Sequence, residues 1–462
     1  MTSIISPVGR GVFAFATPMP RPRRWEWIVI ALVAVIVLVY LPIVARKTVA
    51  HGFGDVQVFF RAGWAIWTGY PLYEVTDGHD WTYHYPPTFA LLMGPFANPL
   101  PGYPQPAWAM PYAASVAVWY VLNFLCLILS LHLWAGALER FASVQARPGF
   151  WQGWWMLRLG PLLMLLPYIG AGLERGQPSP LLLLLIVAFF VLHIERRTVP
   201  ASLALALAIT IKMFPIVLAL FPLLRRDWRF LFCTAGWCVL LLIGLPILCV
   251  GPAATLELYR AMWTDHLAGI ISGSMSTRIA SEISPGAMNS LSIGSVLARI
   301  AAGDAFYSSP LPVWASAIQF LFDAAIVAAI AALGHGGFWN LRGAQPAIGY
   351  PLLVVGAVLF AAVPLMIAVA KPHYATFVAP LLAVLIIEEW RRAGRQAASG
   401  RLVVWALIAL IAMATLELPL WNWTKIAGPM TWALLLLGPS SLSLIRRSAI
   451  MSKAPAAGIV SG

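Results

Sequence analysis

The chain has 462 residues, of which 61% are hydrophobic and 10% are charged, and its mean hydropathy is +0.83. Because a soluble domain carries roughly 25% charged residues, this composition excludes a water-soluble enzyme. The net charge of +13 would suit nucleic-acid binding, but the basic residues stand in short clusters beside apolar runs, as in the cytoplasmic flanks of membrane spans. We therefore expect a lipid bilayer as the partner and no nucleic acid.

The apolar residues form long unbroken runs instead of short alternating segments, which predicts an all-α polytopic membrane protein and argues against a β-barrel. A crossing needs about 20 residues, and the first run follows a basic tail, residues 1–24, and is too long for a cleaved signal peptide. In chain order, the runs that can cross are 25–45, 108–137, 154–171, 178–194, 228–250, 311–333, 346–369, 374–390, 402–420 and 428–445.

Segment 198–224 does not fit a simple crossing. Basic residues flank it on both sides, at Arg196-Arg197 and again at 225–229, and basic flanks belong on the cytoplasmic side. The segment is interrupted at Lys212-Met213-Phe214-Pro215, where proline breaks a helix. We predict a re-entrant hairpin of two half-helices, because irregular backbone at membrane depth is tolerated where it lines a protein cavity.

With this hairpin, about ten transmembrane helices place both termini in the cytoplasm, the second as the tail 446–462. Residues 25–445 then form one transmembrane domain of the plasma (inner) membrane. Two outer loops, 46–107 and 251–310, are too long to be mere connectors. Since most of the polar residues gather in them, we expect the chemistry on the extracytoplasmic face.

The first outer loop supplies three kinds of candidate. Asp55 could act as a general base beside Arg61, although a lone loop aspartate is usually only solvated. His84 and Tyr85, in Tyr83-His84-Tyr85-Pro86-Pro87, could contact a substrate or form part of an aromatic belt. Asp77-Gly78-His79-Asp80 resembles a metal site, but the carboxylates lack Asp-x-Asp spacing and a solvated turn fits better. We therefore expect no metal.

Later candidates lie near the membrane surface or within it. Gln177, in the turn Glu174–Ser179, could hydrogen-bond a sugar or simply join two helices. Lys212 costs about 2.5–3.5 kcal/mol at membrane depth unless it is paired, either with a lipid phosphate or with a buried carboxylate such as Asp323. Lys371 and His373, at a tip between two spans, suit a phosphate leaving group, although a lone histidine at a helix end is more often structural.

Short motifs follow one another along the chain from about residue 50 to 380. They are Gly54-Asp55, Phe59-x-x-Ala62-Gly63, Gly69-Tyr70-Pro71-Leu72-Tyr73, Tyr83-His84-Tyr85-Pro86-Pro87, Gly176-Gln177, Ile211-Lys212-x-x-Pro215, Arg225-Arg226-x-Trp228, Asn289-Ser290-Leu291 and Pro372-His373-Tyr374. Each motif is weak alone, but the ordered set is fairly specific and resembles glycosyltransferase family 87.

The resemblance implies the membrane-embedded GT-C class of fold and an inverting transfer of a sugar, mannose or another hexose or pentose, from a polyprenyl phosphate to a lipid or glycan acceptor. It matches Asp55 to the family's catalytic base and His373 to the histidine near the donor phosphate. Two or three of Lys371, His373, Arg278 and Lys212 could neutralise that phosphate, so we expect neither a nucleotide donor nor a cofactor. Arg61, Glu282 and Asn289 are expected to support the loops or the acceptor. The chain departs from the family at Glu174-Arg175, where other members often carry asparagines.

Two other classes of function stay open from the sequence alone. A transporter or lipid flippase would need paired polar residues along a pathway near the bilayer centre. Ionisable residues near the middle of these segments are few, namely Lys212, Asp323 and Glu417. The third class is a non-catalytic scaffold subunit. The concentration of polar residues in the outer loops favours the glycosyltransferase.

Overall fold

The computed structural model describes residues 24–51, 54–78, 81–142, 154–264, 290–302, 311–332, 346–367, 370–393 and 431. Helices dominate this part of the chain, as predicted, and its only strand-like pairing is a single bridge between Thr76 and Thr82. The predicted spans 402–420 and 428–445 lie outside the described residues except for Thr431.

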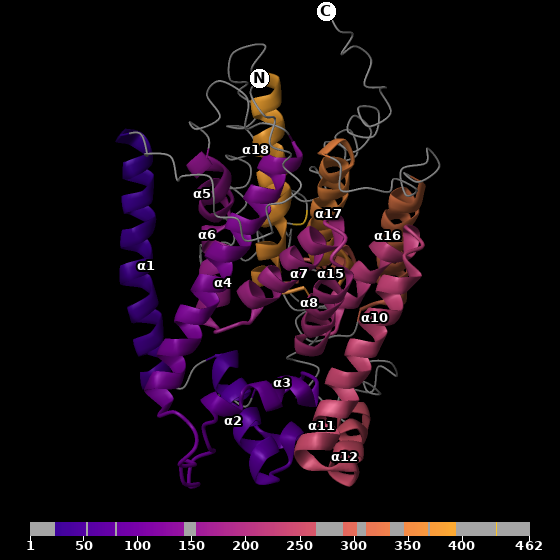
Figure 1. Ribbon diagram of the computed structural model, residues 1–462. Helices are drawn as coiled ribbons and strands as arrows, with labels where there is room; N and C mark the ends of the chain where they lie inside the picture. Colours follow the sequence, from indigo (N-terminus) through magenta and orange to yellow (C-terminus); the bar gives the residue numbers. More distant parts are fainter. Residues whose placement is uncertain are drawn as a thin grey trace, which may run out of the picture.

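Within the described residues, five helices are long and apolar enough to cross a bilayer. Figure 1 shows them aligned in one bundle. The long apolar runs therefore form membrane-length helices, and the chain is a multi-pass membrane protein. Four of them are α1 (Arg24–His51), α4 (Tyr112–Phe141), α16 (Val313–Ala332) and α17 (Pro346–Met366). The fifth is one continuous helix made of α10 (Trp228–Val239), a π turn (Leu240–Gly244) and α11 (Leu245–Val250).

The run 154–171 is not one straight helix. It forms α5 (Trp154–Met164) and α6 (Leu166–Glu174), which meet at 60°. Leu165 leaves helical geometry between them, and Pro167, in the first turn of α6, has no N–H to continue the hydrogen bonding of α5. The pair counts as a sixth crossing only if it is one broken span.

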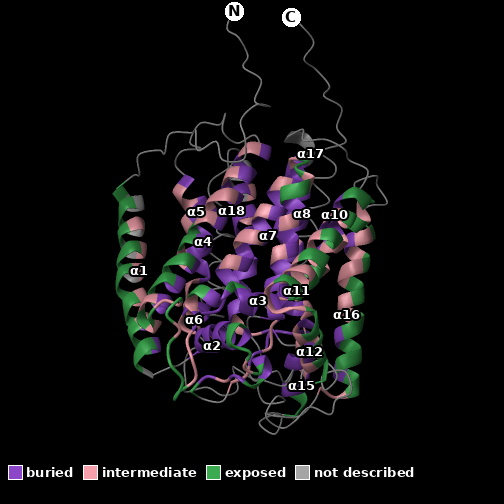
Figure 2. Ribbon diagram, turned by 60° about the horizontal axis from the view of Figure 1, so that its bottom comes forward, coloured by how far each residue is buried: buried purple, intermediate pink, exposed green. Residues whose placement is uncertain are grey.

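Shorter apolar helices fill the bundle. They pack closely because their faces are apolar almost all round, and α7 lies between α4 and α8. Figure 2 shows this interior as buried, whereas α1 is largely exposed along its length. These helices are α7 (Ser179–Ile194), α8 (Thr198–Ile211), the 3₁₀ turn η5 (Phe214–Ala219) with α9 (Leu220–Leu224), α15 (Ile293–Ala302), and the 3₁₀ helix η11 (Pro372–Val378) leading into α18 (Ala379–Ala393).

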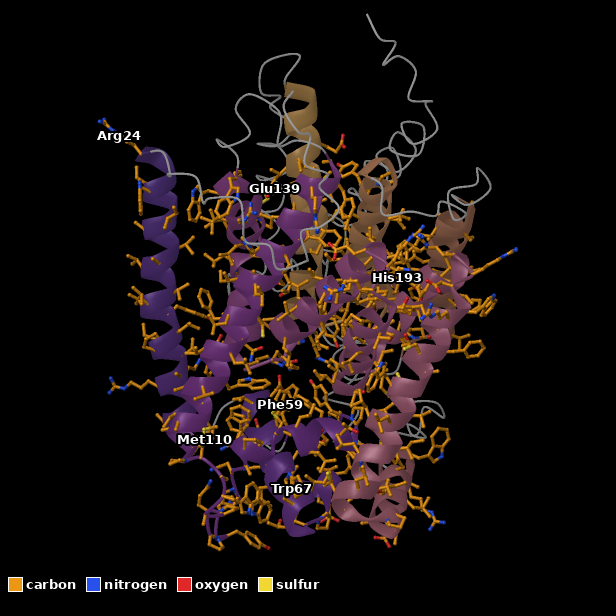
Figure 3. The ribbon with its side chains drawn as sticks, in the orientation of Figure 1. Arg24, Phe59, Trp67, Met110, Glu139 and His193 are labelled. Atoms are coloured by element: carbon orange, nitrogen blue, oxygen red, sulfur yellow. The ribbon has the colours of Figure 1, made fainter. Side chains whose placement is uncertain are left out.

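A helical cap closes one end of the bundle. It contains α2 (Asp55–Thr68), the 3₁₀ turns η2 (Leu72–Glu74) and η3 (Gly94–Phe96), α3 (Pro87–Leu92) and α12 (Pro252–Met262). Figure 3 shows Trp67 and Met110 at this end and Arg24 and Glu139 toward the other. The segment 46–107, expected as an outer loop, is thus a folded helical cap whose buried aromatic side chains pack on one another.

Candidate functional site

Asp55 begins α2, and local backbone geometry fixes its position. Gly54 precedes it with φ of 107°, and a β-carbon there would lie 3.1 Å from the Arg175 carbonyl oxygen. Glycine is therefore the residue that this close approach requires. The Val56 N–H donates to the same Arg175 carbonyl at 3.1 Å. These contacts dock the start of α2 on the turn after α6. Free N–H groups at a helix start favour a carboxylate such as that of Asp55.

Two hydrogen bonds from α4 hold the turn Glu174–Ser179, which contains Gln177. The Trp119 indole donates to the Gly176 carbonyl at 2.8 Å, and the Tyr120 hydroxyl donates to the Glu174 carbonyl at 3.3 Å. Gly176 has φ of 66°, a backbone conformation that residues other than glycine rarely adopt. The turn is consequently a rigid platform between α4 and α2.

Gln177 joins the acid of the site to its lysine. Its Nε2 donates to Asp55 Oδ2, and its Oε1 accepts hydrogen bonds from Lys212 Nζ at 3.2 Å and from the Tyr85 hydroxyl at 3.4 Å. Arg175 adds a second cation, with Nη1 3.9 Å from Asp55 Oδ2. The Asp55 side chain is 16% exposed, so the carboxylate is held between positive groups yet stays open to a substrate.

Lys212 lies where α8 ends. Its backbone is extended, and Pro215 follows in η5, so the helix is interrupted at Lys212 as the sequence predicts. Its ammonium lies 5.1 Å from the ring centre of Tyr85 and 4.7 Å from that of Tyr374. Two aromatic faces and an amide therefore stabilise the charge. The alternative pairing with Asp323 is not found, because Asp323 accepts a hydrogen bond from Gln319 at 2.7 Å.

Tyr85 is held in its protonated form. Burial raises the pKa of Tyr85 well above its ordinary value, and the nearby Asp55 charge raises that pKa further. Its hydroxyl therefore remains a hydrogen-bond donor, which agrees with its bond to Gln177. Tyr85 thus contributes a hydrogen-bond donor to the site.

His373 lies behind this cluster in the first turn of η11, 3% exposed, against α6. A β-carbon on Gly172 would lie 3.0 Å from the His373 β-carbon. Burial lowers the pKa of His373 well below its ordinary value, and the charges of Lys212, Arg175 and Lys371 lower it further. Burial and these three cations therefore favour the neutral imidazole over the charged form that was among the expected cations. Its buried Nε2 has no hydrogen-bond partner among the described residues.

The other predicted residues separate into three groups. His84 contacts Thr82 at 3.1 Å, beside the bridge to Thr76. Arg61 is buried and donates to the Thr76 carbonyl, so it supports this loop; burial lowers the pKa of Arg61, and Asp77 partly offsets that effect. Lys371 caps the start of η11. Arg278, Glu282 and Asn289 lie outside the described residues.

The suspected metal motif shows no metal geometry in its described part. The Asp77 carboxylate accepts from the Trp81 N–H at 3.0 Å, which closes a turn, and His79 and Asp80 lie outside the described residues. Across the described ranges, no three His, Cys, Asp or Glu side chains converge.

The sequence argument did not single out Arg175, Trp81 or Tyr374. Arg175 contacts Asp55 and lies over the Trp81 ring, 5.2 Å from its centre. Arg175 and Tyr374 belong to motifs that were already noted, so adjacency to Gln177 and His373 was the available signal. Trp81 carried none, because only the fold brings it to Arg175.

The arrangement can remove a proton from a hydroxyl and bind an anion. A partly exposed carboxylate held by an amide is a plausible general base. Lys212 and Arg175 flank it and can stabilise a departing negative charge. A neutral imidazole with a free ring nitrogen adds a hydrogen-bonding group.

Comparisons with known proteins agree with this chemistry. Residues 83–360 match the model of glycosyltransferase family 87. The chain is 30% identical over 195 residues to the polyprenol-phosphate-mannose-dependent alpha-(1-2)-phosphatidylinositol mannoside mannosyltransferase of Mycolicibacterium smegmatis, a match that spans 40% of this chain and 41% of that protein. It is 26% identical over 415 residues to the protein of the same name from Mycobacterium tuberculosis, which covers 85% of each. No solved structure matches the chain significantly.

Proposed function

The chain belongs to glycosyltransferase family 87, and on that basis we propose that it transfers a sugar from a polyprenyl phosphate to a hydroxyl of a lipid or glycan acceptor. Both relatives are named for a polyprenol-phosphate-mannose donor and a phosphatidylinositol mannoside, which makes these the first substrates to test. Family membership favours this enzyme over the transporter and scaffold alternatives.

One observation carries the proposal: the Asp55 carboxylate is held by Gln177 between Arg175 and Lys212. In the proposed reaction, Asp55 accepts the proton of the acceptor hydroxyl as its oxygen attacks the anomeric carbon. The bond from that carbon to the phosphate oxygen breaks, and its electron pair leaves with the phosphate. Because attack and departure occur on opposite faces of the sugar, the transfer inverts the anomeric centre.

The cations of the site suit the leaving group. Lys212 and Arg175 would stabilise the negative charge that develops on the phosphate, with Lys371 close behind. His373, being neutral, would contribute a hydrogen bond through Nε2 instead of a charge. Since a lipid monophosphate carries less charge than a nucleotide diphosphate, we propose that no metal and no other cofactor takes part.

The donor and the metal requirement can be tested together. Purified protein in detergent with excess EDTA is given polyprenyl-phosphate mannose or the matching nucleotide sugar, together with phosphatidylinositol mannoside. We expect transfer from the polyprenyl donor alone and no effect of chelation. Transfer from the nucleotide sugar alone, or loss of activity with EDTA, would contradict the proposal.

We propose the same topology as the sequence predicts: about ten crossings, a re-entrant segment 198–224, cytoplasmic termini and an extracytoplasmic site in the plasma membrane. Support for the hairpin comes from its two ends, because His193 Nε2 before it lies 3.9 Å from Asp227 Oδ2 after it. Neighbouring ends fit a segment that enters and leaves the bilayer on one side.

A further inference from the structure

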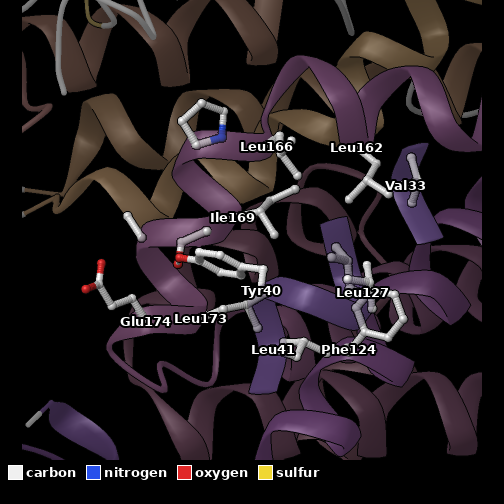
Figure 4. A pocket seen from close by; sticks show the side chains of 14 residues that line it. Val33, Tyr40, Leu41, Phe124, Leu127, Leu162, Leu166, Ile169, Leu173 and Glu174 are labelled. Carbon is white, nitrogen blue, oxygen red and sulfur yellow. The ribbon is translucent and has the colours of Figure 1, made fainter. Parts of the chain in front are cut away.

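A cavity of about 380 Å³ lies beside the site, between α1 and the group α4, α5 and α6. Its volume falls within the range of roughly 300–1,000 Å³ that is typical of ligand sites. Of the residues that line it, Glu174 alone is charged, and nearly all the others are apolar. Figure 4 shows Glu174 at one end of the cavity and Val33 and Leu162 at the other, so it forms a groove with one polar end.

The polar end of the groove adjoins the site. Glu174 directly precedes Arg175, whose guanidinium lies 3.9 Å from the Asp55 carboxylate. Lys47 of α1 forms an ion pair with Glu174 there. A hydrocarbon chain lying in the groove would therefore bring its polar head group to the approach to Asp55.

The helix α6 separates the groove from His373. The Tyr40 hydroxyl of α1 donates to the Gly170 carbonyl at 2.9 Å, whereas Gly172 faces His373. Two residues along an α-helix are about 200° apart around its axis. The groove and the imidazole thus lie on opposite sides of α6.

Charge is divided between the same two sides. Lys212 lies over the ring of Tyr374, the neighbour of His373, and Lys371 caps the same turn. On the groove side the acidic Glu174 already holds Lys47. Lys212, Lys371 and His373, which we place near the donor phosphate, thus lie on the first side, whereas the charged residue that lines the groove is Glu174, whose carboxylate is paired with Lys47. The groove suits a lipid whose reactive end carries hydroxyl groups, since carboxylates accept hydrogen bonds from them.

We infer that this groove binds an acyl chain of the acceptor, and hence that the acceptor is a lipid. The inference rests on the proposed function and deepens it, because it assigns donor and acceptor to opposite sides of α6. The apolar wall removes the acyl chain from water and from competing lipids, while the head group reaches Asp55 from the end marked by Glu174.

The test uses substitutions that fill the groove. Leu41 and Val37 line it from α1, and Leu41→Trp and Val37→Phe should occupy part of its volume. The same helix offers matched controls that face outward: Leu38, 72% exposed, and Val35, 57% exposed. Leu38→Trp and Val35→Phe add the same bulk outside the groove.

Two diazirine probes measure occupancy in the reconstituted full-length protein, one on an acyl chain of phosphatidylinositol and one on a polyprenyl phosphate. We expect the acyl probe to label the α4 and α6 peptides that line the groove. Leu41→Trp and Val37→Phe should each reduce that labelling about tenfold, because each added ring displaces roughly two methylenes of the acyl chain from the groove. Both controls should label like the wild type.

Kinetics provide a second measurement. The groove variants should raise KM for phosphatidylinositol mannoside about tenfold and leave KM for the polyprenyl donor unchanged. They should also leave transfer to the deacylated head group unchanged. Polyprenyl labelling of the groove, or equal behaviour of groove and control variants, would overturn the inference. Labelling does not need sugar transfer, so the two proposals fail separately. A wild-type protein without transfer activity would contradict the proposed function. An active protein that both probes label equally in the groove would contradict the assignment of the groove to the acceptor.

Discussion

Gly176 lies so close to Val56 that a β-carbon at position 176 would overlap the Val56 side chain. This approach lets the turn after α6 and the start of α2 share one surface, and the next residue, Gln177, then reaches Asp55. The catalytic geometry therefore depends on the packing of two backbone segments that are far apart in the sequence.

Gly176→Ala should destabilise the protein and reduce transfer. The new β-carbon meets Val56, and φ of 66° is strained for alanine, each effect costing about 1–3 kcal/mol. The loss of stability is measured as the decrease in melting temperature in detergent, with size-exclusion chromatography as the readout of folded protein. Gly136→Ala in α4 is the matched control, because nothing lies within 4 Å of its new β-carbon. Equal melting of the two variants would show that the close contact is unimportant.

Asp55→Asn should abolish most transfer. It removes the base but preserves size, and the loss of a general base typically costs roughly 10²–10⁴-fold in rate. Transfer from the polyprenyl donor in membranes measures this, alongside the amount of protein. Glu74→Gln, at an exposed carboxylate in the same cap, should keep full activity. An Asp55→Asn enzyme of nearly normal rate would remove Asp55 from the mechanism.

His373 should show no titration in the activity profile near neutral pH. Burial lowers the pKa of its imidazole, so the neutral form, and with it activity, should persist as the pH falls through about 6.5, the ordinary histidine value. His373→Gln, which can still hydrogen-bond, should keep more activity than His373→Ala, which should lose about tenfold, the value of one hydrogen bond. A loss of wild-type kcat/KM as the pH rises through about 6.5, absent in His373→Gln, would mean that the imidazolium is required.

Cysteine labelling should place both ends of the segment 198–224 on the cytoplasmic side. In a background in which the four native cysteines are replaced by alanine, an impermeant maleimide should reach Arg197→Cys and Arg229→Cys only after cells are permeabilised. Tyr103→Cys, 50% exposed on the cap, should label in intact cells. Labelling of Arg197 and Arg229 from opposite sides would replace the hairpin by a crossing.

Five of the predicted runs form membrane-length helices in the described part of the chain, because a long apolar run has few alternatives in a bilayer, whereas 178–194 and 374–390 form shorter apolar helices. The sequence does not predict the bend between α5 and α6, although Pro161 and Pro167 signal a weak point, since the 60° angle depends on packing against η11 and α18. The same limit applies to the cap at 46–107. Its tyrosines and tryptophans read as an interfacial belt, but many of them are buried against each other.

For the site, chain order identifies Asp55, Gln177, Lys212 and Tyr85, and the structure brings these four together. The sequence cannot show that burial and three neighbouring cations lower the pKa of His373, because these are tertiary properties. It also cannot pair Arg175 with Asp55. The two residues are far apart in the sequence, and the folded chain brings them together where the Val56 N–H donates to the Arg175 carbonyl.

The indole of Trp119 ties the turn beneath Asp55 to the first third of α4. That helix has 30 residues and is about 45 Å long at 1.5 Å per residue, whereas the hydrocarbon core of a bilayer is about 30 Å thick. The helix must therefore tilt or protrude, by an amount that the surrounding lipid sets. We expect transfer rates in vesicles to depend on the acyl length of the host lipid, and a rate that is constant across lengths would disprove this dependence. The thickness of the membrane would then set how far the carboxylate stands from the plane of the head groups on which it acts.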